Sequence, residues 1–257
     1  MLLKPLKYLQ CSSSNNREVG SIMKHSNVLV IGGSYGIGRY IADVLASEYA
    51  NVVILSRTPP PENSLLNWRQ LDLSVIDKGH EQLQKILDEF NGKLDAVFYS
   101  AVFYGPRHAS FLTTDEMDWK QQLNVNLYGL WISLMLTLPL LKCNAPSLFV
   151  HLSSEVMYNI RPYGIGYAVT KAAACNLMNS LSQEDLEGDV RLVQLLPAII
   201  IDSNRTGNKH TNNFNYSDSN LSKYIQQVSL KLLQTRGKGM HGKNLVLDKN
   251  GNLVILE

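Results

Sequence analysis

A tyrosine and a lysine lie four positions apart in the segment Tyr167-Ala168-Val169-Thr170-Lys171. On a helix this spacing places both side chains on one face, close enough to interact. A free tyrosine has a pKa of about 10, too high for efficient proton exchange at neutral pH, and a neighbouring ammonium lowers that pKa by stabilising the phenolate. The pair therefore predicts an acid/base centre, although the same spacing also occurs between unrelated residues on helix surfaces.

A glycine-rich turn, Gly32 to Gly38, lies between an apolar run and an amphipathic segment. The run from Val28 to Ile31 is typical of a strand buried on both faces, and apolar residues recur at helical spacing from Tyr40 to Tyr49. Glycines let a diphosphate approach a helix N-terminus, whose N–H groups then bind the anion. The turn therefore predicts a dinucleotide site, and the alternative is a tight turn that binds no ligand.

Strand-like and helix-like segments alternate from Asn27 onward. Strands are expected at 28–31, 52–55, 68–71, 96–99, 148–152, 191–196 and 245–247. Helices are expected at 40–49, 83–90, 115–141, 167–186 and 224–233. Strands joined by such helices form a parallel sheet with helices on both faces. We therefore predict an α/β fold, a Rossmann-type doubly wound parallel sheet in one domain of residues 27–257, with ligands at the carboxyl ends of the strands.

The glycine spacing resembles that of the short-chain dehydrogenase/reductase family, whose turn reads Thr-Gly-x-x-x-Gly-Ile-Gly. Four residues match that turn and Ile31 replaces its threonine; the matching residues are Gly32, Gly36, Ile37 and Gly38. Ser154 lies thirteen residues before Tyr167, which is the family's serine-to-tyrosine interval, and Asn126 matches the asparagine of the family's long helix. The resemblance spans roughly Asn27 to Glu257 and implies the catalytic tetrad Asn126, Ser154, Tyr167 and Lys171.

The resemblance also implies the role of each tetrad residue. Ser154 would orient the substrate oxygen, and Tyr167 would donate a proton to it during reduction or remove one during oxidation. Lys171 would lower the pKa of Tyr167 and hold the nicotinamide ribose, while Asn126 would fix a water that returns the proton through Lys171. The cofactor would carry the hydride. The residues implied in cofactor binding are Gly32, Ser34, Tyr35, Gly36, Ile37, Gly38, Ser56, Arg57, Asp72, Leu73, Ser100, Ala101, Tyr167, Lys171, Pro197 and Ile200.

Two residues at the end of the second strand bear on the choice of cofactor. An NAD site usually has a carboxylate there that binds the ribose 2′-hydroxyl. Here Ser56 stands in that position and Arg57 follows, and a guanidinium pairs with the 2′-phosphate of NADP. We therefore expect NADP(H) to be favoured over NAD(H), against the alternative of a solvated arginine. Asp72 matches a family aspartate beside the adenine, but its position also suits a helix cap.

The sequence departs from the family pattern at three places. The family's Asn-Asn-Ala-Gly after the fourth strand is Tyr99-Ser100-Ala101-Val102, which puts adenosine contacts in doubt. The family's Pro-Gly is Pro197-Ala198, and Asp202 stands where threonine often contacts the cofactor. A carboxylate facing diphosphate is unfavourable, so either the register differs or Ser203 takes that part.

The substrate pocket is expected to come from loops. The polar segment 203–222 matches the family's substrate lid and is expected to order on ligand binding. Further lining residues, each of which could equally be an ordinary surface residue, are Phe103, Tyr104, Arg107, His108, Tyr158, Arg161 and Tyr163.

Composition limits the other functions. The net charge is +2, with acidic and basic residues interspersed, which gives no case for nucleic acid or a membrane surface. The apolar stretch Leu127–Leu141 is short for a membrane span. The three cysteines lie far apart without metal-ligand spacing, so we expect no metal site and reduced thiols in a cytoplasmic protein. Residues 1–26 are expected to be a disordered or non-native extension, with organelle targeting as the alternative.

These observations predict an NADP(H)-dependent oxidoreductase that acts on a small-molecule carbonyl or alcohol. A second enzymic hypothesis keeps the fold but runs isomerisation or dehydration. The non-enzymic alternative is a dinucleotide-binding regulatory or scaffold protein, favoured by the altered segments at Tyr99 and Ala198. Apolar residues on more than one face of the two long helices, together with the resemblance, predict a homodimer or homotetramer.

Overall fold

The computed structural model describes residues 26–48, 51–61, 66–106, 110–158, 162–186, 188–197, 220–248 and 250–256. The strands are β1 (Asn27–Ile31), β2 (Asn51–Ser56), β3 (Asn67–Gln70), β4 (Ala96–Tyr99), β5 (Ser147–Leu152), β6 (Val190–Pro197), β7 (Asn244–Leu247) and β8 (Leu253–Leu256). The helices are α2 (Gly36–Ser47), α3 (Ile76–Asp88), α4 (Glu116–Leu123), α5 (Gly129–Cys143), α6 (Ile165–Leu181) and α7 (Asn220–Thr235). Shorter helical turns are η2 (Phe111–Thr113), η3 (Asn124–Tyr128) and η4 (Glu155–Met157).

The strands form one sheet in the order β3-β2-β1-β4-β5-β6-β7-β8. Strands β1 to β7 pair in parallel, and β8 pairs antiparallel with β7. The chain order reverses between β1 and β4, which makes the crevice at their carboxyl ends the switch point where such folds bind ligands. The predicted Rossmann-type doubly wound fold is therefore confirmed, with β8 as a strand that the sequence did not predict.

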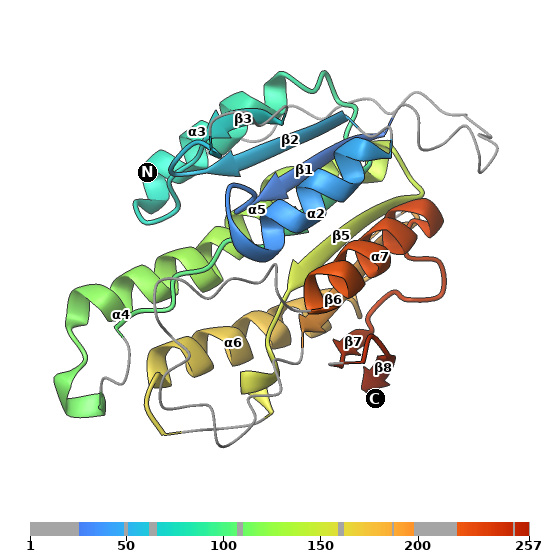
Figure 1. Cartoon of the computed structure of the whole chain (residues 1–257). Helices are drawn as coiled ribbons and strands as arrows, with labels where there is room; N and C mark the ends of the chain where they lie inside the picture. The colour runs from blue at the N-terminus through green and yellow to red at the C-terminus, as the bar shows by residue number, and fades with distance from the viewer. Residues whose placement is uncertain are drawn as a thin grey trace.

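Helices cover both faces of this sheet (Figure 1). The side chains of β1 alternate between the two faces of the sheet. Val28 and Val30 pack with α2 and α7, whereas Leu29 and Ile31 pack with α3, α5 and α6. An apolar side chain at every position is what a parallel strand buried on two faces requires. The two cores together hold the carboxyl ends of β1, β2, β4 and β5 at one edge.

The predicted helix 115–141 is found as α4, η3 and α5 in direct succession. The middle part, η3, is a π-helical turn that contains Asn126. Within the described residues, 116–143 is one helix long and apolar enough to span a bilayer by length and composition, yet 56% of its most apolar window is buried inside the fold. It packs on the sheet beside α3 as the predicted core helix.

Two expectations need correction. The helix predicted at 167–186 begins at Ile165 and ends at Leu181, where the Ser182 hydroxyl donates to Asn179 O and the chain turns away. Cys143 is disulfide-bonded, so the expectation of three reduced cysteines is wrong for that residue, whereas Cys175 is a buried free thiol. The predicted extension 1–26 lies outside the described residues apart from Ser26, which is buried and accepts a hydrogen bond from Arg236.

Candidate active site

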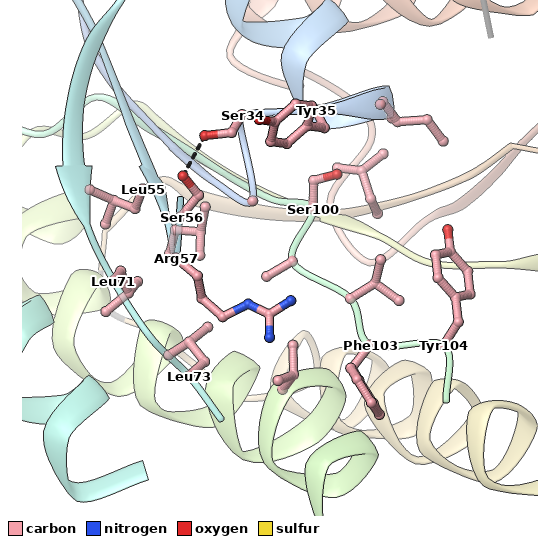
Figure 2. Close-up of a pocket in the computed structure, with 18 of the residues that line it drawn as sticks. Ser34, Tyr35, Leu55, Ser56, Arg57, Leu71, Leu73, Ser100, Phe103 and Tyr104 are labelled. Carbon is pink, nitrogen blue, oxygen red and sulfur yellow. Dashed lines mark hydrogen bonds between the residues drawn. The ribbon is translucent and has the colours of Figure 1, made fainter. Parts of the chain in front are cut away.

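A cavity of about 380 Å³ opens at the switch point of the sheet. It is lined by the residues that follow β1, β2, β4 and β5, by the last residue of β6, and by two side chains of α6. Figure 2 shows Ser34 and Tyr35 on one side, Ser56 and Arg57 on another, and Ser100, Phe103 and Tyr104 along a third. The cavity thus joins the glycine turn to the tyrosine–lysine pair of α6.

The glycine turn has the close backbone contacts that its sequence predicts. Gly32 has φ +87°, and a Cβ built there would lie 2.5 Å from Ala101 N. A Cβ on Gly38 would lie 2.2 Å from Gly32 O and 3.1 Å from Ser100 Cβ. Gly36 has φ +60° with open space around a built Cβ. Only glycine therefore fits at 32 and 38 without displacing backbone.

Gly38→Ala is expected to lower the free energy of unfolding by about 1–3 kcal/mol and to weaken dinucleotide binding, because the new methyl must push Gly32 away. Gly92→Ala is the control for binding only: its positive φ strains an alanine although a built Cβ has open space, and it lies outside the cavity lining, so stability should fall without a loss of dinucleotide affinity. Urea unfolding and NADPH titration of both variants measure the two effects. If Gly38→Ala matches the wild type in free energy of unfolding and in NADPH affinity, the close contact at Gly32 is contradicted.

The end of β2 carries a cluster of hydroxyl groups. Ser34 Oγ lies 2.5 Å from Ser56 Oγ (Figure 2). Thr58 O lies 2.8 Å from Ser34 Oγ and 2.7 Å from Ser56 Oγ. Trp68 Nε1 donates to Ser56 Oγ at 2.9 Å. These bonds connect the glycine turn to β2 beside the exposed Arg57, where sequence reasoning placed the ribose 2′-substituent.

Helix α6 brings Tyr167 and Lys171 to the other end of the cavity. Lys171 is 3% exposed and its Nζ donates to Leu152 O at 2.8 Å. Burial lowers the pKa of Lys171 from its ordinary value of 10.5 to about 8, because the ammonium loses its hydration. The lysine therefore remains mostly charged at neutral pH and sits one helical turn from the tyrosine.

Asn126 and Ser154, the other two predicted catalytic residues, are not among the described residues that line the cavity. Asn126 is fully buried; its Oδ1 accepts from Phe103 N at 2.8 Å and its Nδ2 donates to Phe103 O and to Thr170 Oγ1, each at 3.0 Å. The Ser154 hydroxyl accepts from Val156 N at 3.3 Å and caps η4. Asn126 thus fixes the loop after β4 to α6.

The structure brings most of the predicted cofactor residues together. Those that line the cavity are Gly32, Ser34, Tyr35, Gly36, Ile37, Ser56, Arg57, Leu73, Ser100, Ala101, Tyr167, Lys171 and Pro197. Gly38 and Asp72 do not line it, and Ile200 lies outside the described residues, as do Arg107, His108, Arg161, Ala198, Asp202 and Ser203. Of the predicted substrate residues, Phe103 and Tyr104 line the cavity, whereas Tyr158 and Tyr163 do not.

Asp72 has a local structural role. Its Oδ1 accepts hydrogen bonds from Ser74 N at 2.9 Å and Ser74 Oγ at 2.6 Å, which forms a turn just before α3. Partial burial alone would raise its pKa, but the two bonds from Ser74, with the charges of Arg57 and Lys78, outweigh this and lower the pKa. The helix-cap interpretation of Asp72 is wrong, since the N-cap residue of α3 is Val75, and the contact with the adenine stays a prediction.

Several lining residues were missed. They line the cavity because they lie at or beside strand ends or on η3, a position that residue type alone does not reveal. These residues are Thr58, Val125, Leu152 and Ser153. Tyr99, which replaces a family asparagine, points into the core instead and its hydroxyl donates to Val125 O at 2.5 Å. The altered segment therefore leaves Ser100, Ala101 and Val102 as the cavity wall.

A family model described as short chain dehydrogenase matches residues 26–213. The chain belongs to the short-chain dehydrogenase/reductase family. It is therefore an NAD(P)-dependent oxidoreductase that acts on CH–OH or C=O groups. Strands β1 to β6, the glycine turn and the tyrosine–lysine pair lie within the matched region.

Relatives of this dehydrogenase/reductase agree in fold and length. A tropinone reductase homolog from Datura stramonium is 27% identical over 199 residues, which cover 72% of this chain and 74% of the relative. A short chain dehydrogenase from Salmonella enterica subsp. enterica serovar Typhi superposes with a TM-score of 0.71 at 21% identity, over 89% of this chain and 97% of that one. An alcohol dehydrogenase from Thermococcus sibiricus, complexed with 5-hydroxy-NADP, has a TM-score of 0.58 and 26% identity, over 67% of this chain and 76% of that one.

Proposed function

We propose that this short-chain dehydrogenase/reductase uses NADP(H) to reduce a carbonyl or oxidise an alcohol, with Tyr167 as the general acid/base. One observation carries the proposal: a single cavity has the glycine turn and Arg57 at one end and Tyr167 with Lys171 at the other. Arg57 and Lys171 are the charged residues among its described lining, which includes no carboxylate. Such a positive cavity suits a cofactor that carries a diphosphate and a further phosphate.

The glycine turn, Arg57 and Lys171 would hold the dinucleotide, which supplies hydride chemistry when bound. Ser34 and Ser56 offer hydroxyl groups where an NAD-selective site has a carboxylate, and Arg57 supplies a guanidinium beside them. A carboxylate there would repel a 2′-phosphate, whereas hydroxyls and a guanidinium bind it. The NADP derivative held by the Thermococcus relative is in keeping with this preference.

The tetrad would work through proton transfer at the Tyr167 hydroxyl. Lys171, held by Leu152 O, keeps a positive charge near the phenol and favours the phenolate after the proton has left. Ser154 would orient the substrate oxygen by donating its hydroxyl proton, since that hydroxyl already accepts from Val156 N. We assign Asn126 the positioning of the loop after β4, because its bonds to Phe103 and Thr170 engage both amide hydrogens.

Fluorescence titration of the purified protein with NADPH and with NADH tests the cofactor proposal. Arg57→Ala is expected to weaken NADPH binding about tenfold and to leave NADH binding unchanged, because only NADPH carries the phosphate that Arg57 would bind. Arg69→Ala is the matched control, since Arg69 lies on β3 next to β2 but pairs with Glu89 outside the cavity. Equal losses for the two nucleotides, or no NADPH binding by the wild type, contradict the proposal.

We also propose that the active form is a homodimer or homotetramer. Large apolar side chains are exposed on neighbouring helices, Tyr128 on η3, Trp131 on α5, and Ile165 and Val169 on α6. Burial of such a face between subunits removes apolar surface from water. A cytoplasmic location stays a prediction from sequence.

A further inference from the structure

The loop after β4 places a second phenol ring against Tyr167. The ring centroids of Tyr104 and Tyr167 lie 5.1 Å apart, with a tilt of 40° between the ring planes. Both residues line the cavity. Figure 2 shows Phe103 and Tyr104 with their rings on opposite sides of this loop, and the Phe103 side chain packs against the core. The loop therefore anchors itself with one aromatic ring and presents the other to the cavity.

Two buried amides fix the position of Tyr104. Asn126 binds both backbone polar groups of Phe103, and Gln122 Nε2 donates to Tyr104 O at 2.7 Å. Gln122 in turn is packed between two glycines: a Cβ at Gly105 would lie 2.3 Å from its Nε2, and a Cβ at Gly166 would lie 1.8 Å from its Oε1. Gly166 directly precedes Tyr167, so the same amide that holds Tyr104 contacts the start of α6.

This packing makes Tyr104 a fixed wall beside the Tyr167 ring. The cavity is also lined by Val102, Phe103, Leu152, Ser153 and Pro197, which are apolar except for Ser153, and by the charged Lys171. Tyr104 remains 55% exposed despite its contact with Tyr167. The exposed part of the Tyr104 ring is therefore available to the group next to a carbonyl whose oxygen reaches Tyr167.

We propose that the substrate is an uncharged ketone, aldehyde or alcohol with an aryl ring next to the reacting carbon, and that Tyr104 determines this specificity. A flat ring packs against the Tyr104 ring in an offset or edge-to-face arrangement, which a puckered saturated ring of the same size does not reproduce. The proposal rests on the function proposed for Tyr167. It adds the class of substrate and the residue that selects it.

Acetophenone and cyclohexyl methyl ketone are suitable probes, because they share the methyl ketone and differ in whether the six-membered ring is flat. The measured quantity is the ratio of their kcat/KM values with NADPH in each variant, divided by the same ratio in the wild type. This division removes the difference in intrinsic reactivity between the two ketones. Tyr104→Leu is expected to lower the ratio roughly 2- to 12-fold, the range of one aromatic contact. Tyr104→Phe, which keeps the ring, is expected to retain it.

Phe111→Leu is the matched control, since Phe111 is also an exposed aromatic residue but lies on η2 outside the cavity lining; its ratio should equal that of the wild type. An unchanged ratio in Tyr104→Leu overturns the aryl specificity, as does a wild-type enzyme that neither reduces nor saturably binds acetophenone. NADPH titration and the Tyr167→Phe variant, measured alongside, separate this failure from failure of the oxidoreductase mechanism. Tyr167-dependent reduction of both ketones with no effect of Tyr104→Leu leaves the mechanism standing and removes the specificity.

Discussion

Tyr167→Phe is expected to lower kcat about 10²- to 10⁴-fold, the usual contribution of a positioned general acid, while NADPH affinity stays within about twofold of the wild type. The variant keeps the aromatic ring that packs against Tyr104 and removes only the hydroxyl. Lys171 retains its bond to Leu152 O, and the glycine turn and Arg57 are untouched. The effect should therefore fall on proton transfer and leave cofactor binding in place.

Initial rates of NADPH oxidation with a carbonyl substrate, together with fluorescence titration of NADPH, measure the two quantities separately. Tyr40→Phe removes a phenolic hydroxyl from a partly exposed residue of α2 outside the cavity lining and should behave as the wild type. Full turnover in Tyr167→Phe excludes this phenol as the proton donor. A parallel loss of NADPH affinity shows instead that the hydroxyl serves binding.

The sequence predicted the fold because buried parallel strands are marked by runs of apolar residues and their connections by helical periodicity. The eighth strand escaped prediction for a related reason. Leu253 to Leu256 is a short apolar run, but the strand is an edge whose residues remain partly exposed. It exists because the turn at Gly251, with φ +86°, folds it back onto β7, and such pairing depends on a neighbour that periodicity cannot show.

The candidate site was partly predictable. Residues tied to a motif, such as the glycine turn and the Tyr167–Lys171 pair, lie where their spacing placed them around the cavity. Asp72 was assigned through a family position, yet its carboxylate is engaged by Ser74. The π-helical turn at Asn126 was invisible in the sequence, because the apolar pattern runs on through it; the Tyr99 hydroxyl, bonded to Val125 O, contacts it from β4.

Lys171→Met is expected to lower kcat/KM for NADPH about 10²-fold at pH 7 and to change the response of the enzyme to pH. Burial disfavours the ammonium and lowers the pKa of Lys171 to about 8. The charge that stabilises the phenolate is therefore present below about pH 8 and lost above it. The wild-type kcat/KM for reduction should fall about tenfold per pH unit above that value. This alkaline limb of the pH–rate profile should be absent from Lys171→Met.

His151 is a buried histidine whose pKa responds to the charge of Lys171, so its substitution serves as a control. Burial, and then repulsion by Lys171, lower the pKa of His151 to about 3, so it stays neutral throughout the range in which Lys171 titrates. His151→Gln should therefore keep the limb near pH 8. Lys120→Met, an exposed lysine paired with Glu116, should leave both rate and profile unchanged. A limb near pH 8 that persists in Lys171→Met would assign that titration to another group, and the charge on Lys171 would then not set the alkaline limit of catalysis.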